Sequence, residues 1–155
     1  KNIHPINLGI SDKTKITKFF YNKLCSVEKN FFYPLSSVGL HSTKFVKELH
    51  DEKISFNTMM FMFDDLIEKF NMPKPTHIFV DAYGSEKEIM MGMEKTLSSN
   101  TLKKIYLDIE DDCKYIEETW IFKYLKSKNF KIKELIDKHH DYAKSNWNAI
   151  FERIN

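Results

Sequence analysis

Apolar positions along the chain follow two different periods, and together they predict a mixed α/β fold. Alternating or short apolar runs predict strands, because successive side chains of a strand point to opposite faces. Apolar residues at helical spacing, such as Leu66, Ile67 and Phe70, predict helices between these strands. The expected strands cover residues 3–10, 15–21, 53–61, 77–81, 104–109, 130–136 and 146–154. The expected helices cover residues 64–70, 85–98 and 115–127.

The order of these segments predicts an architecture. Strands and helices alternate in the middle of the chain, which favours a mostly parallel sheet with helices on its faces. The last two strands have no helix between them, so we expect an antiparallel strand at the C-terminal edge of the sheet. Residues 26–50 contain a proline, a glycine and several serines, and we expect a long loop of the kind that often covers a site.

Composition and charge exclude several classes of protein. The 155 residues are 42% hydrophobic and 30% charged, as in an ordinary globular domain. The net charge is only +2 and the lysines are interleaved with acids, so no basic stripe points to nucleic acid. No apolar run approaches the roughly 20 residues of a membrane helix, and no signal peptide opens the chain. Cys25 and Cys113 lack metal-ligand spacing and fit a reducing compartment, so the prediction is a cytoplasmic protein.

The strongest candidate site lies between an expected strand and the following helix. Asp81 ends the strand, Gly84 permits a tight turn, and Ser85 and Glu86 open the helix. Ligands in open α/β sheets bind outside the carboxyl ends of the strands, where Asp81 stands. The alternative is a plain strand-turn-helix junction with a capping acid.

A second candidate is Asp108, which lies within a strand of apolar neighbours and must be paired, hydrogen-bonded or retained for function. Together with Asp81 and Glu86 it could act as a general base or offer oxygen ligands to a divalent cation. The third candidate is His139-His140-Asp141, where the alternative is a surface loop. No phosphate-binding loop, nucleophile elbow or dinucleotide-binding glycine motif is present.

Two segments, 63–70 and 75–86, resemble the C-terminal half of FkbM-type methyltransferases. The shared features are a short Asp-Asp-Leu helix, a proline, and a strand that ends in an acid before a Gly-x-Glu turn. Segments 8–12 and 148–153 are also similar to the family's pattern. The resemblance implies a Rossmann-like methyltransferase sheet that lacks its first strands, because the family's glycine loop and ribose-binding acid would precede Lys1. On this reading, residues 1–155 form a single partial domain.

The resemblance also implies a function. Family members transfer a methyl group from S-adenosylmethionine, typically to a hydroxyl of a small-molecule or glycan acceptor. The implied catalytic residues are Asp81, Glu86 and Asp108, and the implied cofactor-binding residues are Asp12, Asp81 and Gly84, with no metal. Tyr83 stands where the family has an acid. The alternative is a non-catalytic methyltransferase-like α/β interaction module. The unfilled sheet implies a homo-oligomer or a missing N-terminal segment as the partner of this chain.

Overall fold

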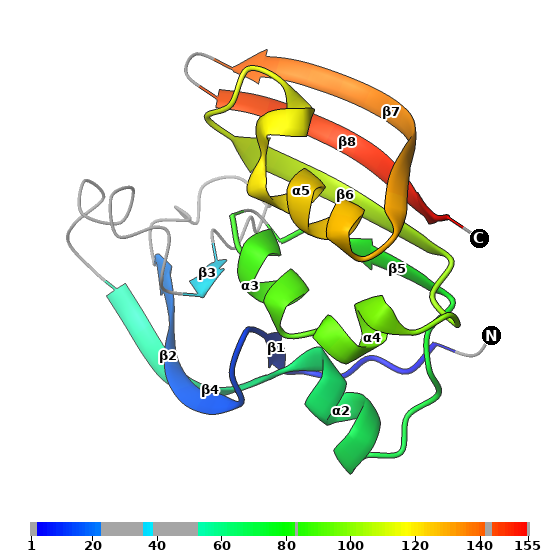
Figure 1. The fold of residues 1–155 in the computed structure, drawn as a ribbon. Helices are drawn as coiled ribbons and strands as arrows, with labels where there is room; N and C mark the ends of the chain where they lie inside the picture. Colours follow the sequence, from blue (N-terminus) through cyan, green and yellow to red (C-terminus); the bar gives the residue numbers. More distant parts are fainter. Residues whose placement is uncertain (1–2, 23–35, 39–52, 83, 142–143, 155) are drawn as a thin grey trace.

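The computed structural model describes residues 3–22, 36–38, 53–82, 84–141 and 144–154. These residues form two four-stranded sheets with short helices beside them (Figure 1). The strands are β1 (Gly9–Ile10), β2 (Lys15–Asn22), β3 (Ser36–Val38), β4 (Lys53–Phe61), β5 (His77–Val80), β6 (Lys104–Asp111), β7 (Phe130–Asp141) and β8 (Lys144–Arg153). The helices are α2 (Phe63–Lys69), α3 (Glu86–Met91), α4 (Glu94–Ser98), the 3-10 helix η1 (Ile116–Glu118) and α5 (Trp120–Ser127).

The C-terminal sheet, called sheet B here, holds the main core. Its strand order is β5-β6-β8-β7, with β5 parallel to β6 and the other neighbours antiparallel. Helices α3, α4 and α5 cover one face of sheet B (Figure 1). Alternate residues of the strands are buried under these helices, including Ile105, Leu107, Trp147 and Phe151. This pattern follows from the two-residue period of a strand.

The second sheet, called sheet A here, has the order β1-β4-β2-β3. Strands β2 and β4 pair antiparallel over their whole length, from Lys15 opposite Met60 to Asn22 opposite Lys53. They form a curved arm that extends away from sheet B (Figure 1). Strand β1 is only two residues long and pairs parallel with the end of β4.

The expected Rossmann-like, mostly parallel sheet is wrong. In the part of the chain that the structure describes, only the pairs β1–β4 and β5–β6 are parallel, and the strands divide into two mixed sheets. Strands β5 and β6 follow each other in the chain and are linked by helices α3 and α4. A helical crossover of this kind allows neighbouring strands to run parallel. The C-terminal strand β8 is not at an edge either: it lies between β6 and β7, and β7 is the edge strand.

The helix expected over 85–98 is divided into α3 and α4 around Gly92. A Cβ atom on Gly92 would lie 2.0 Å from the carbonyl oxygen of Ser11, so only glycine fits this close approach. The helix expected over 115–127 is likewise divided into η1 and α5. Thr119 separates them, because its hydroxyl accepts a hydrogen bond from the Phe122 N–H at 3.1 Å and caps α5.

Arg153 ties the ends of two helices to sheet B. Its guanidinium donates hydrogen bonds to the carbonyl oxygens of Leu97 at 2.6 Å, Leu102 at 2.8 Å and Lys128 at 3.2 Å. It also lies 4.3 Å from the centre of the Phe130 ring. Burial lowers the pKa of this guanidinium. The positive charge suits this place, because carbonyl groups at helix C-termini carry partial negative charge.

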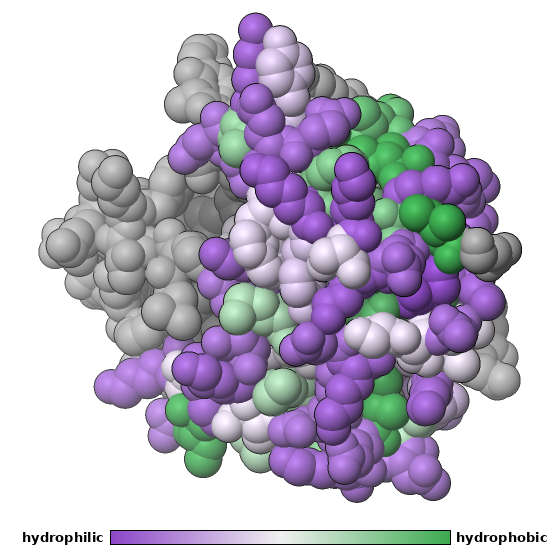
Figure 2. Space-filling view, viewed as in Figure 1, coloured by the Kyte–Doolittle hydropathy of each residue, from purple (hydrophilic) through white to green (hydrophobic). Residues whose placement is uncertain are grey.

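The helix-covered side of the molecule carries a mostly hydrophilic surface (Figure 2). On α5, the rings of Trp120 and Tyr124 stack with their centres 4.5 Å apart. Lys87 and Lys128 lie over these two rings, at 5.1 and 5.4 Å from the ring centres. Lys128 also forms an ion pair with Glu94 at 2.9 Å, so this column joins α3, α4 and α5 and is a packing feature.

Candidate functional site

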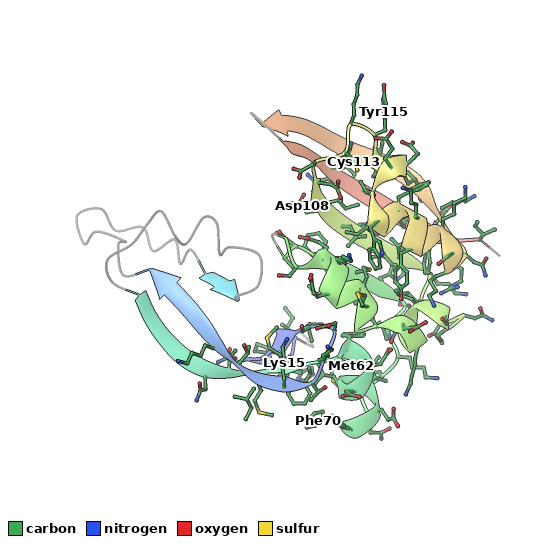
Figure 3. All side chains as sticks on the ribbon, turned by 60° about the vertical axis from the view of Figure 1, so that its left-hand side comes forward. Lys15, Met62, Phe70, Asp108, Cys113 and Tyr115 are labelled. Carbon is green, nitrogen blue, oxygen red and sulfur yellow. The ribbon has the colours of Figure 1, made fainter. Side chains whose placement is uncertain are left out.

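Asp81 directly follows β5, and Asp108 lies within β6, the parallel neighbour of β5. The register of β5 and β6 ends with Val80 opposite Leu107; β5 ends there, whereas β6 continues through Asp108 to Asp111. Val80 and Leu107 are buried under the helices, so the following side chains point to the other face of sheet B, called the open face here. Asp81 is exposed and Asp108 is half-buried. Figure 3 shows Asp108 on β6.

The turn after β5 is closed by Glu86. Gly84 has a φ of 88°, which L-residues with a side chain rarely adopt, and its N–H donates a 3.0 Å hydrogen bond to Oε1 of Glu86. The Ser85 N–H donates to the carbonyl oxygen of Ala82 at 3.1 Å. Glu86 is buried, whereas Ser85 makes no side-chain capping hydrogen bond. The carboxylate at the start of α3 therefore orders the turn.

Asp12 lies at the opposite end of α3 from Gly84. Its neighbour Ser11 touches Gly92 at the end of α3, and the Ser11 hydroxyl donates to Asp12 at 3.0 Å. Eight residues separate Gly84 from Gly92, about 12 Å along a helix. Figure 3 shows Lys15, three residues beyond Asp12, far from Asp108. A single ligand that contacts both Asp12 and Gly84 would have to extend along α3.

Asp64 has a structural role that the sequence did not reveal. Asp64 stands in the first turn of its own helix, α2, whose N-cap is Met62. The Asp64 carboxylate instead caps α4: it accepts hydrogen bonds from the N–H groups of Lys95 at 2.7 Å and Thr96 at 2.9 Å, and from the Thr96 hydroxyl at 2.6 Å. Asp64 is buried, and its own N–H donates to the carbonyl oxygen of Gly92.

The second acid of the same helix, Asp65, faces the β1–β2 turn. It accepts hydrogen bonds from the hydroxyl of Thr14 and from Nζ of Lys69, the latter at 3.1 Å. These two bonds hold the pKa of Asp65 below its ordinary value, with Thr14 as the larger cause. The two adjacent acids of α2 therefore hold different segments: Asp64 binds α4, and Asp65 binds the turn between β1 and β2.

A cavity of about 370 Å³ lies between α2 and α4. Ile67, Met72 and Pro75 contribute apolar walls, and the cavity is also lined by Glu68 and Lys95, which form an ion pair at 3.0 Å. Neither Asp81 nor Asp108 lines this cavity. The hollow and the candidate strand ends are therefore separate features of the molecule.

The three residues of the histidine candidate lie in a strand and not in a loop. His139, His140 and Asp141 belong to the end of β7, opposite Asn146, Ser145 and Lys144 of β8. Tyr83, Cys25 and most of the expected loop 26–50 lie outside the described residues. Among the residues that are described, no group of three or more His, Cys, Asp or Glu side chains could hold a metal ion.

Comparisons with known proteins give no assignment: no family model, curated protein or solved structure matches this chain. No helix in the described part is both long and apolar enough to cross a membrane.

Proposed function

We propose that this chain takes part in S-adenosylmethionine-dependent methyl transfer to a hydroxyl group of a small molecule or glycan. The observation that carries this proposal is the parallel pairing of β5 with β6, which brings the end of β5, followed by Asp81, beside the strand that holds Asp108. Ligands of α/β sheets bind outside the carboxyl ends of parallel strands, which is where Asp81 stands. The ordered turn at Gly84 follows directly and brings backbone close to the same edge.

Methyl transfer to a hydroxyl needs alignment of donor and acceptor and a group that receives the hydroxyl proton. S-adenosylmethionine supplies an electrophilic methyl group when bound. In the proposed arrangement Asp108, on the open face of β6, accepts the proton of the acceptor hydroxyl. Asp81 and the backbone around Gly84 hold polar groups of the ligands. Glu86 acts through the turn it closes, because its carboxylate already binds the Gly84 N–H.

The test is a calorimetric titration of the purified chain with S-adenosylmethionine. We expect a dissociation constant of about 1–100 μM, and a loss of at least tenfold in affinity in Asp81→Asn. Asp112→Asn is the matched control, because Asp112 is an exposed acid in the loop after β6. Absence of binding by the folded wild-type chain would refute the proposal, and so would equal losses in the two variants.

The second candidate function is a non-catalytic interaction module. It is favoured by Phe79, which is 74% exposed on β5, next to Tyr106 in the register of β5 and β6. An exposed aromatic side chain on a sheet face offers a large contact area to another molecule. Sedimentation velocity over a range of protein concentrations tests self-association. Under this alternative Phe79→Ser abolishes self-association, whereas a wild-type chain that stays monomeric at all concentrations contradicts that form of the module.

A further inference from the structure

The cavity between α2 and α4 is walled by two loops that the chain itself holds in place. The loop after α2 turns at Asn71, which has a φ of 49°, and the N–H of Met72 donates to the carbonyl oxygen of Ile67 at 3.0 Å. The loop after α4 is closed on Oγ of Ser99, which accepts from the Thr101 N–H at 3.3 Å and lies 2.8 Å from the Thr101 hydroxyl. The walls are therefore formed before any ligand arrives, as in most small-molecule sites.

The charges that line the cavity leave one lysine without a counter-ion. Two carboxylates belong to the lining, and both have partners: Asp64 accepts three hydrogen bonds, and Glu68 forms an ion pair with Lys95 at 3.0 Å. Lys74, the other lining lysine, is exposed and forms no hydrogen bond or ion pair with the residues that the structure describes. It stands between two prolines, which restrict the backbone of segment 73–75. The cavity therefore offers an ordered cation to an anionic ligand.

The other lining groups indicate which kind of anion fits. Ile67, Met72 and Pro75 are half-buried and give the cavity an apolar wall. The hydroxyls of Ser99 and Thr101 share a single hydrogen bond, so one of their two protons is left to donate to a ligand. A singly charged group matches one lysine. A phosphate group carries a charge of about −1.5 to −2 at neutral pH and would be repelled more strongly by the two lining carboxylates.

We propose that this cavity is a binding site for a small organic carboxylate. The body of the ligand packs against the apolar wall, and its carboxylate accepts hydrogen bonds from the Lys74 ammonium and from the remaining hydroxyl proton. The cavity volume of about 370 Å³ lies within the range of about 300–1,000 Å³ that small-molecule sites have. Neither Asp81 nor Asp108 lines the cavity, so this site goes beyond the proposed methyl transfer and is tested without S-adenosylmethionine.

The experiment titrates benzoate into the full chain with isotope-labelled methionine methyl groups and follows them by NMR. The Met72 methyl reports on the cavity, whereas Met59 and Met91 are exposed, lie outside its lining and report on non-specific binding. We expect a saturable shift of the Met72 signal with a dissociation constant of about 1–10 mM, and unmoved signals of the other two. Benzamide has the ring without the charge, and inorganic phosphate has charge without an apolar body. Each should bind about fivefold more weakly than benzoate, or less tightly still.

A pair of lysine variants tests the role of the cation. Lys74→Gln should weaken benzoate binding about fivefold or more and leave the unfolding midpoint unchanged, because its side chain is exposed. Lys69→Gln is the matched control and should bind benzoate like the wild type, because Lys69 pairs with Asp65 and does not line the cavity. The proposal is overturned if benzoate leaves the Met72 signal unmoved, or if benzamide or phosphate binds as tightly as benzoate. Equal affinities of the two lysine variants overturn it as well.

Discussion

The capping of α4 by Asp64 gives the sharpest stability prediction, because one carboxylate serves three donors from another segment. Asp64 is 6% exposed, and its partners are the N–H groups of Lys95 and Thr96 and the Thr96 hydroxyl. The substitution Asp64→Ala removes the cap and leaves these donors without their acceptor. Replacing a capping residue by alanine costs about 0.5–2 kcal/mol. Each buried donor left unsatisfied adds about 1–3 kcal/mol, although water entering the vacated space recovers part of that.

We therefore expect Asp64→Ala to lower the free energy of unfolding by about 3 kcal/mol, a large part of the 5–15 kcal/mol of a typical domain. Asp64→Asn keeps one acceptor oxygen, so a loss of about 1–2 kcal/mol is expected. Asp65→Asn is the matched control, because Asp65 is the adjacent acid on α2 and its partners are exposed. At neutral pH Asp65→Asn should lose much less stability than Asp64→Ala.

The assay is urea unfolding followed by tryptophan fluorescence, with the slope of the transition fitted for every variant. Hydrogen exchange provides the local readout, because the amide protons of Lys95 and Thr96 should lose protection in Asp64→Ala and keep it in Asp65→Asn. The reasoning is refuted if Asp64→Ala unfolds within about 0.5 kcal/mol of the wild type. It is also refuted if the two variants lose equal stability.

Three other perturbations have outcomes that the contacts predict. Gly92→Ala should lower the thermal midpoint by several degrees, because its Cβ would lie 2.0 Å from the Ser11 carbonyl oxygen; an unchanged midpoint would contradict that close approach. The pKa of Asp65 is lowered in the folded chain, so its contribution is present above its ordinary value of 3.8 and is lost as pH falls through the lower folded value. Unfolding curves of wild type and Asp65→Asn should therefore converge below pH 3.8 and separate above it, and parallel curves would argue against the hydrogen bond from Thr14. Arg153→Met should cost about 2–4 kcal/mol in urea unfolding, because three carbonyl groups lose their donor, and a loss below about 1 kcal/mol would show that water replaces the guanidinium.

Local sequence patterns located most of the secondary structure. Strand β4 has the predicted bounds 53–61, and α2 and β5 lie within one residue of the predicted ones. These segments are predictable because their period and their boundary residues act over a few positions only. The predicted strand 3–10 is reduced to Gly9–Ile10, since β4 pairs with only those two residues of it.

The candidate site was partly accessible to sequence reasoning. An acid after an apolar strand identified Asp81, and an acid inside an apolar strand identified Asp108. That Asp108 lies on the strand beside the end of β5 depends on β5 pairing with β6, and two helices separate these strands along the chain. The hydrogen bonds of Asp64 to α4 were not predictable for a similar reason, since its partners lie about thirty residues away.

The sequence by itself determined which segments become strands and helices. It did so because the periods of 2 and 3.6 residues are local properties of the backbone. Only the tertiary structure decided how the strands are shared between two sheets, that β8 lies between β6 and β7, and which end of which helix each acid stabilises. Pairing and capping join residues far apart in the chain, and local pattern carries no information on which distant partner completes a hydrogen bond.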